Sequence, residues 1–258
     1  MNILVSNDDG INANGLRELV KELSRLGDVY VVAPDSERSA NSHHFTLSGR
    51  LKIEEREIEG AKKAYALWGT PSDCVHAGIL YLIENVDLVV SGINQGWNVS
   101  SDLIYSGTVA AARQAFMENI PSIAFSFNSY TKKDFRLPAR LAKIITEKYI
   151  REPHNKDYFL NVNFPDLPLE EIKGMKACGT YGKIFYDEHY EIESEDGVNY
   201  LRIHGADMRY DFDTTDMDID INALEAGYIT ITPLYNNHIN HDFLNEVYDK
   251  WHDFNHKQ

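Results

Sequence analysis

Residues 3–10 read Ile-Leu-Val-Ser-Asn-Asp-Asp-Gly, a short apolar run that stops at a polar, turn-forming cluster. Such a run is typical of a buried strand. Leucine and valine then recur at helical spacing over residues 16–23, and a second apolar run, residues 29–33, ends at Pro34. These features predict a helix and another strand. The opening of the chain therefore indicates the strand–helix–strand unit of a parallel α/β sheet.

The same alternation continues through the first half of the chain. A helix of residues 71–80 would begin at its proline, and residues 108–117 form an alanine-rich helical pattern. Residues 86–91 and 121–126 are further apolar runs, which predict two more buried strands. The predicted fold class is α/β: a Rossmann-like, doubly wound, mostly parallel sheet covered on both faces by helices. Such a sheet binds its ligands at the carboxyl ends of its strands.

The pattern changes after residue 165. Residues 1–165 are therefore interpreted as the core, and residues 166–258 as a C-terminal part of one overall domain. Residues 183–203 favour a β-hairpin or extended arm, because Asp-Gly at 196–197 is a strong turn signal. Residues 187–220 contain twelve Asp or Glu against two Arg, which indicates an exposed arm or simply a solvated face.

The last part of the chain predicts a return to the core. A helix near residues 221–225 and a strand at 228–232, stopped by Pro233, precede a terminal helix at 241–254. That terminal helix carries one apolar stripe, formed by Phe243, Leu244, Val247, Trp251 and Phe254. The stripe would serve either core packing or contact between subunits.

The composition excludes several classes of protein. With 40 acidic and 25 basic side chains among 258 residues, the formal charge is −15, which argues against a reader of duplex nucleic acid. No apolar run approaches the roughly 18–20 residues that a membrane span needs. Two cysteines cannot make a disulfide framework, and no signal peptide fits the N-terminus. We therefore expect a cytoplasmic protein with no membrane partner.

Asp8 and Asp9 directly follow the first predicted strand. Adjacent carboxylates repel each other, and a hard divalent cation such as Mg²⁺ or Mn²⁺ would let them coexist, since it prefers oxygen ligands. The alternative is an Asp turn that caps the following helix. Ser39, in a polar loop after the second strand, would offer a hydroxyl at the same edge of the sheet, or be an ordinary loop residue.

A long loop after the third predicted strand carries the most informative polar residues. Ser106, Gly107 and Thr108 open the helix that follows, where N–H groups, two hydroxyls and the helix dipole suit a phosphate group. A simple N-cap is the alternative. Asn94 would be a neutral oxygen ligand that does not repel an incoming phosphate. Asn98 would either reach that phosphate or only form a turn.

Other candidate residues carry less information. His43 and His44 lie near Ser39 in sequence and are better explained as surface residues. Cys74 has no neighbour that would activate a thiolate, so a buried helix residue is expected there. A P-loop is excluded because no Lys-Ser or Lys-Thr follows the glycine spacings, and Asp-Asp-Gly after the first strand is not the pyrophosphate turn of a NAD enzyme.

Several motifs, taken in order along the chain, resemble the SurE survival-protein family. They are Asn-Asp-Asp-Gly at 7–10, Val-Ala-Pro at 32–34, Tyr-Ala-Leu-Trp-Gly-Thr-Pro-Ser-Asp-Cys-Val at 65–75, Ser-Gly-Ile-Asn-Gln-Gly-Trp-Asn at 91–98, Tyr-Ser-Gly-Thr-Val-Ala-Ala-Ala at 105–112, Asn-Val-Asn-Phe-Pro at 161–165 and Gly-Tyr-Ile-Thr-Ile-Thr-Pro-Leu at 227–234. The resemblance covers residues 2 to about 235. Ala40 departs from it, since many members have glycine after the serine that corresponds to Ser39.

The resemblance implies a metal-dependent phosphatase that acts on nucleoside 5′- and 3′-monophosphates and, in some members, on polyphosphate. It implies one Mg²⁺ or Mn²⁺ held by Asp8, Asp9, Ser39 and Asn94, and a phosphate cradle formed by Ser106, Gly107 and Thr108. It also implies homodimers or homotetramers that exchange C-terminal elements.

Residues and resemblance together predict a 5′/3′-nucleotidase, in which a metal-activated water attacks phosphorus and Asp8 is the general base. The predicted catalytic residues are Asp8, Asn94, Ser106 and Thr108, and the predicted phosphate-binding residues are Ser39, Asn94, Asn98, Ser106, Gly107 and Thr108. The alternative is a non-catalytic nucleotide- or phosphate-binding module on the same fold. Two carboxylates beside the phosphate argue against that alternative.

Overall fold

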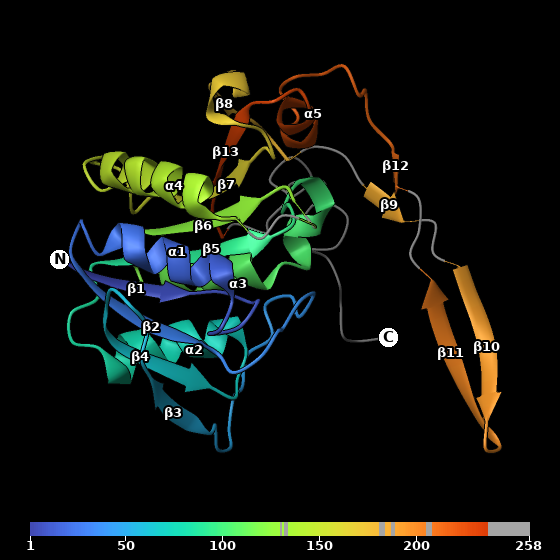
Figure 1. The fold of residues 1–258 in the computed structure, drawn as a ribbon, viewed down its shortest axis with the longest axis horizontal. Coiled ribbons are helices and arrows are strands. Elements are labelled where there is room, and N and C mark those ends of the chain that lie inside the picture. The colour runs from blue at the N-terminus through green and yellow to red at the C-terminus, as the bar shows by residue number, and fades with distance from the viewer. Residues whose placement is uncertain (130, 132–133, 181–183, 187–188, 205–207, 237–258) are drawn as a thin grey trace, which may run out of the picture.

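A computed structural model describes residues 1–129, 131, 134–180, 184–186, 189–204 and 208–236 (Figure 1). Its centre is a nine-stranded sheet in the order β3-β4-β2-β1-β5-β6-β7-β13-β8. The strands are β1 (Asn2–Ser6), β2 (Asp28–Pro34), β3 (Ile53–Arg56), β4 (Ala61–Leu67), β5 (Leu88–Gln95), β6 (Ser122–Phe127), β7 (Phe159–Phe164), β8 (Met175–Ala177) and β13 (Ile229–Leu234). The strands from β4 to β7 in that order are all parallel, which confirms the Rossmann-like prediction.

The strands at the two edges run against this parallel centre. β3 pairs with β4 in antiparallel fashion, and β13 is antiparallel to β7, with β8 parallel to β13 beyond it. The C-terminal part of the chain therefore returns to the same sheet as the core, as predicted for the strand at 228–232. The observed strand begins one residue later and runs through Pro233.

Helices cover both faces of the sheet (Figure 1). α1 (Asn14–Leu23) and α4 (Arg136–Tyr149) pack together on one face, and α2 (Pro71–Ala77), with a π-helical turn η1 (Gly78–Leu82), packs with α3 (Gly107–Met117) on the other. Side chains of a strand alternate between the faces. Ile3 and Val5 are buried in the first core and Leu4 in the second, together with Cys74 and Val75 of α2.

The C-terminal part projects an arm from the body (Figure 1). β10 (His189–Glu195) and β11 (Val198–His204) form an antiparallel hairpin, and β9 (Ile184–Tyr186) pairs with β12 (Met208–Tyr210) closer to the body. The turn residues Asp196 and Gly197 both have positive φ, of 50° and 79°, as a two-residue hairpin turn of type I′ requires. The predicted hairpin and its turn are confirmed.

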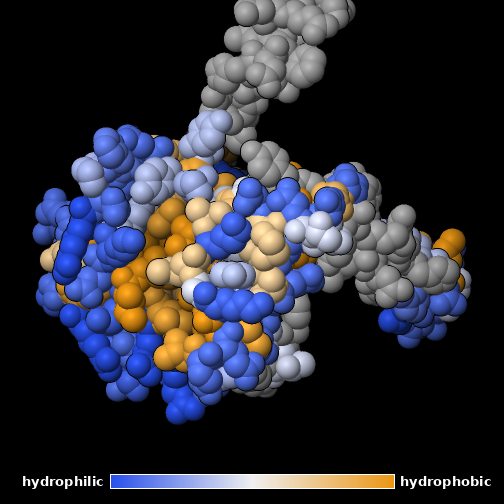
Figure 2. All heavy atoms as spheres, turned by 90° about the horizontal axis from the view of Figure 1, so that it is seen from above, coloured by the Kyte–Doolittle hydropathy of each residue, from blue (hydrophilic) through white to orange (hydrophobic). Residues whose placement is uncertain are grey.

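α5 (Asp220–Glu225) confirms the helix predicted near 221–225. The predicted terminal helix at 241–254 lies outside the described residues. No described helix is long and apolar enough to cross a bilayer. Viewed from above, hydrophobic side chains gather at the middle of the body and are ringed by hydrophilic ones (Figure 2).

Candidate active site

Parallel strands bring their carboxyl ends to one edge of the sheet, and the polar residues singled out above follow those ends. Asp8 and Asp9 follow β1, and Ser39 lies in the loop after β2. Asn94 is near the end of β5, where the pairing with β6 shifts register after Ser91. A cavity of about 450 Å³ at this edge is lined by Asp8, Ser39, Ala40, Asn94, Gln95, Gly96, Trp97, Asn98, Asp102, Tyr105 and Ser106. The structure thus brings four separate segments together.

A second cavity adjoins the first. It has a volume of about 410 Å³ and is lined by Asp9, Asn12, Ala13, Asn14, Gly15, Glu37, Ser39, Gln95 and Phe135. The two cavities share Ser39 and Gln95. Asp8 faces one cavity and Asp9 the other, so the carboxylate pair lies between them.

Asp8 is almost fully buried, and its side chain lies against the first residues of α3. The Thr108 hydroxyl donates a hydrogen bond to its Oδ1. Burial raises the pKa of Asp8, and the hydroxyl of Thr108 and the N–H groups of Thr108 and Gly107 lower it in part. Asp8 is therefore a carboxylate whose negative charge is only partly compensated by neighbouring donors.

Asp9 accepts a hydrogen bond of 3.1 Å from the backbone N–H of Gln95. Burial, followed by repulsion from Asp8, raises the pKa of Asp9 to about 7, and Glu37 adds a smaller repulsion. The adjacent Asp8 thus destabilises the charged form of Asp9, which agrees with the repulsion that the sequence suggested.

Ser39 is exposed, and its hydroxyl donates to Glu37 Oε1 at 2.7 Å. Asn94 is half-buried, and its Nδ2 donates to the carbonyl oxygen of Gly96 at 3.0 Å. The bond to Gly96 engages the amide nitrogen of Asn94 and leaves the amide oxygen as the group for a cation. Both side chains line the cavity that holds Asp8.

Asn98 is fixed by a network on β6 and β7. Its N–H donates to Asn163 Oδ1 at 2.8 Å, and its side-chain amide donates to Ser126 Oγ at 2.7 Å. Its carbonyl accepts from the amides of Asn161 and Asn163, at 2.8 and 3.0 Å. The backbone of this loop is therefore held rigidly beside the cavity, which neither alternative for Asn98 had anticipated.

Ser106 is the N-cap of α3, since its hydroxyl accepts a hydrogen bond of 3.1 Å from the N–H of Val109. It also lines the first cavity. Gly107 and Thr108 lie behind Asp8 and do not line either cavity. A Cβ on Gly107 would come within 2.8 Å of Asp8 Cβ, so only glycine permits this close approach. These contacts place Gly107 and Thr108 against Asp8.

The donor set at this edge suits a hard divalent cation. It offers two carboxylates, a hydroxyl and an amide oxygen, without nitrogen or sulfur ligands. Among the described residues, no group of three or more His, Cys, Asp or Glu could hold a metal. A cation here would therefore need the neutral oxygens of Ser39 and Asn94 beside Asp8 and Asp9, which is the set that the resemblance implies.

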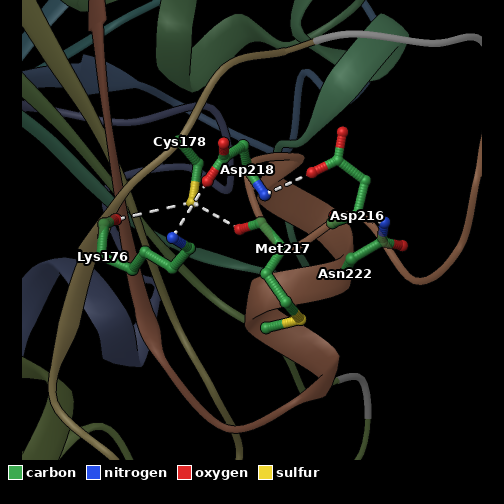
Figure 3. Close-up of polar contacts among 6 residues, drawn as sticks. All are labelled: Lys176, Cys178, Asp216, Met217, Asp218 and Asn222. Atoms are coloured by element: carbon green, nitrogen blue, oxygen red, sulfur yellow. Dashed lines mark hydrogen bonds and ion pairs between the residues drawn. The ribbon is translucent and has the colours of Figure 1, made fainter.

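A segment of the C-terminal part packs against the loops of the site, and its attachment begins at β8. Cys178, just after β8, donates from Sγ to the carbonyl oxygens of Lys176 and Met217, at 3.6 and 3.9 Å (Figure 3). The Lys176 ammonium pairs with Asp218 at 3.1 Å. These contacts attach the segment that precedes α5 to the edge of the sheet.

This attachment brings Asp220 next to Ser100, which lies in the same loop as Asn98. Asp220 is fully buried, and its two carboxylate oxygens accept from the N–H and the hydroxyl of Ser100, at 2.9 and 2.8 Å. Burial raises the pKa of Asp220 to about 6, against these hydrogen bonds. Ser100 lies two residues after Asn98 and begins the 3₁₀ turn η2 (Ser100–Ile104). Sequence reasoning missed this contact, because no local pattern links residues so far apart.

The remaining candidates lie away from both cavities. His43 Nε2 bonds to Gln114 Oε1 at 3.0 Å, and the carbonyl of His44 accepts from the Thr70 hydroxyl at 2.7 Å. Cys74 and Cys178 are free and buried. Burial raises the pKa of both thiols, that of Cys178 to about 11, so neither carries a reactive thiolate near neutral pH.

The fold and this site define a class: parallel α/β proteins with an acidic, oxygen-rich ligand site at the carboxyl ends of the strands. A family model described as survival protein SurE matches residues 3–186. The chain belongs to the SurE family.

Similar proteins extend this match over nearly the whole chain. A protein of Clostridium botulinum (strain Alaska E43 / Type E3) named 5′-nucleotidase SurE is 39% identical over 251 residues, covering 96% of this chain and 98% of its own. One of Clostridium beijerinckii with the same name is 37% identical over 255 residues, with the same coverage. The crystal structure of the SurE protein from Aquifex aeolicus is 34% identical, with a TM-score of 0.81, and covers 97% of this chain and 99% of its own.

Proposed function

We propose that this protein is a metal-dependent phosphomonoesterase that hydrolyses nucleoside 5′-monophosphates to nucleoside and phosphate. Its relatives are named 5′-nucleotidase SurE, and its candidate site has the oxygen donors such chemistry uses. Nucleoside 3′-monophosphates and short-chain polyphosphate present a similar terminal phosphoryl group and are proposed as further substrates.

The observation that carries this proposal is the Asp8–Asp9 pair. Burial raises the pKa of both carboxylates, and the charge of Asp8 raises that of Asp9 further. A site that bound only an anion would gain nothing from two carboxylates beside the phosphate. A divalent cation would neutralise both charges and would allow an anionic monoester to approach. We propose Mg²⁺ or Mn²⁺, held by Asp8, Asp9, Ser39 and Asn94.

When bound, such a cation would polarise a phosphoryl oxygen and lower the pKa of a water molecule. Asp8 is the proposed general base, and Thr108 holds its carboxylate in position. The Ser106 hydroxyl accepts from Val109, so its own hydrogen is available to a phosphate oxygen. Asn94 and Asn98 would fix further phosphate oxygens. Gly107 and Thr108 would act through Asp8 and through the positive end of the α3 dipole.

The test is phosphate release from AMP by the full-length protein. We expect release with Mn²⁺ or Mg²⁺, loss of release in EDTA, and recovery when metal is restored. Full activity in EDTA would remove the metal from the mechanism. Asp8→Asn should lower kcat by at least about a hundredfold, the usual contribution of a general base, whereas wild-type turnover in this variant would remove Asp8 from that role.

A non-catalytic binding module makes a different prediction. In that case AMP would bind in the presence of Mn²⁺ and would be recovered intact after prolonged incubation. Calorimetric titration followed by chromatography of the nucleotide separates the two functions.

We also propose that the arm mediates homo-oligomerisation. Six large hydrophobic side chains on β10 and β11 are about half or more exposed, namely Tyr190, Ile192, Val198, Tyr200, Leu201 and Ile203. Light scattering after size exclusion should give a dimer or tetramer, and replacing Ile192 and Leu201 by serine should shift the mass towards the monomer.

A further inference from the structure

Tyr105 differs from the other aromatic residues at the two cavities in how much of its ring is exposed. Its side chain is 59% exposed, whereas Trp97 is 9% and Phe135 3% exposed. Trp97 and Phe135 are packed in hydrophobic clusters. Among the described residues that line either cavity, Tyr105 is therefore the aromatic residue with a ring surface open to a ligand.

The backbone of Tyr105 is held from both sides. Its N–H donates to the carbonyl of Asp102 at 3.0 Å, and its carbonyl accepts from the N–H of Ser42 at 2.9 Å. The hydroxyl of Ser42 also donates to the carbonyl of Ile104 at 2.7 Å. These bonds connect the loop after β2 to η2 at the mouth of the cavity. An exposed ring on a fixed backbone needs little ordering when a flat ligand binds.

The position of Tyr105 defines what part of a substrate it would meet. It directly precedes Ser106, and both residues line the cavity that contains Asp8. A monoester whose phosphate lies against Ser106 would extend its alcohol part towards the mouth of that cavity. A nucleoside carries a flat heteroaromatic base there, and such bases stack on tyrosine.

We propose that Tyr105 forms the nucleobase subsite, stacking on the base of a nucleoside monophosphate whose phosphate is bound at Ser106. This inference rests on the proposed function and specifies its substrate class. Every base has a π-face, so stacking tolerates all four bases. Purines offer the larger face, and AMP and GMP should therefore have lower KM values than UMP and CMP.

The experiment compares a substrate that has a base with one that lacks it. For the wild type, KM should be lower for AMP than for ribose 5-phosphate. Tyr105→Ala should raise KM for AMP about tenfold, the loss expected for one base–aromatic stack, and leave KM for ribose 5-phosphate within about twofold. Tyr105→Phe, which keeps the ring, should retain the wild-type values. Ile104→Ala is the matched control, because Ile104 is 64% exposed on the same turn and does not line either cavity.

Equal increases in both KM values for Tyr105→Ala, or no increase for AMP, would overturn the inference. Failure of the proposed function is distinguishable, because the wild type would then release phosphate from neither ester. Calorimetry with adenosine and with inorganic phosphate tests the subsite without turnover. Tyr105→Ala should weaken adenosine binding about tenfold and leave phosphate binding unchanged, and unchanged adenosine binding would again overturn the inference.

Discussion

Ser100 and Asp220 are 120 residues apart in the chain and are joined by two hydrogen bonds, one from the N–H of Ser100 and one from its hydroxyl. Through this pair the C-terminal part of the chain holds the loop that carries Asn98 and leads to Ser106. A carboxylate accepting from an N–H and an O–H of one residue restricts that residue more than either bond alone. The geometry of the loop that carries Asn98, on the proposed phosphate-binding side of the site, therefore depends on a segment outside it.

Ser100→Ala tests this coupling at one of its two bonds. The variant keeps the N–H bond, and Asp220 Oδ1 keeps the N–H of Ile221 at 2.8 Å. We expect a loss of about 1 kcal/mol in the free energy of unfolding and a rise of a few-fold in KM for AMP, measured by denaturation and steady-state kinetics. Ser194→Ala, on the exposed arm, is the control. Wild-type stability and KM in Ser100→Ala would show that the bond has no influence on the site.

Asp220 also predicts a pH dependence of stability. Its pKa is raised to about 6 in the folded protein by burial, above its ordinary value in the unfolded chain. The folded state then binds an extra proton between about pH 4 and 6, so the stability contributed by this group is present at low pH and is lost as the pH rises through about 6. The loss amounts to about 3 kcal/mol at most.

Asp220→Asn removes this titration. The melting temperature of the variant relative to wild type should therefore increase between pH 4.5 and pH 7.5, as followed by circular dichroism. A difference between the two proteins that is constant over this range would mean that Asp220 titrates normally in the folded state.

Thr108→Val tests the donor to Asp8. The substitution keeps the shape of the side chain and removes a hydroxyl that lowers the pKa of Asp8. We expect a stability loss of about 1–3 kcal/mol and an acidic limb of the pH–rate profile that moves to higher pH. Thr146→Val is the matched control. The buried hydroxyl of Thr146 has no hydrogen-bond partner among the described residues, so its loss should be neutral or stabilising. The same stability change in both variants would contradict a specific role for the Thr108 hydroxyl.

Asp9→Asn tests two effects of this carboxylate: destabilisation of the metal-free protein and the proposed binding of the metal. Burial and Asp8 raise the pKa of Asp9 to about 7 in the folded protein, so the stability contributed by its protonated form is present at low pH and is lost as the pH rises through about 7. At pH 8 in EDTA, the variant should therefore melt at a higher temperature than wild type. In millimolar Mn²⁺ this difference should become smaller, since a cation at 100 times its Kd stabilises the wild type by about 2.7 kcal/mol and the variant lacks one of the proposed ligands.

Glu37→Gln is the control for the Asp9 variant, because it removes a nearby exposed charge from the same cavity. It should keep most of the Mn²⁺-dependent rise in melting temperature. An equal rise in Asp9→Asn and in wild type would place the metal elsewhere.

Much of the parallel core was predictable because its signals are local. β1, β2, β5 and β6 are short apolar runs with turn residues behind them, and the Asp196–Gly197 turn follows from the positive φ that type I′ geometry requires. The sequence interpretation did not identify β3, β4, α4 or β7. β4 lacks the continuous apolar run that marks β1, β2, β5 and β6, because Lys62 and Lys63 lie at exposed positions in its first half. α4 contains Pro138, which is tolerated only because it lies in the first turn.

The candidate site, like the fold, could be predicted from the sequence only in part. Asp8, Asp9, Ser39, Asn94 and Ser106 could be named from motifs, and the structure places each of them at one of two adjoining cavities. Their binding roles stay predictions. Gln95 and Tyr105 lie within the quoted motifs, but no chemical role was assigned to either from the sequence, and the Ser100–Asp220 pair belongs to no motif. The structure shows that these residues contact distant segments: Gln95 bonds to Asp9, Tyr105 to Ser42 and Ser100 to Asp220.

The amino-acid sequence by itself determined the strand–helix alternation, the hairpin turn, the family and the residues that can offer oxygen ligands. Periodicity, backbone conformational preference and residue chemistry are properties of short segments, and they can be recognised without knowing where those segments meet. Only the tertiary structure decided which residues share a cavity, which ring is open to solvent, and how far the pKa values of Asp9 and Asp220 rise. Burial and electrostatic repulsion depend on groups brought close by folding, and their distances in space are independent of their separation along the chain.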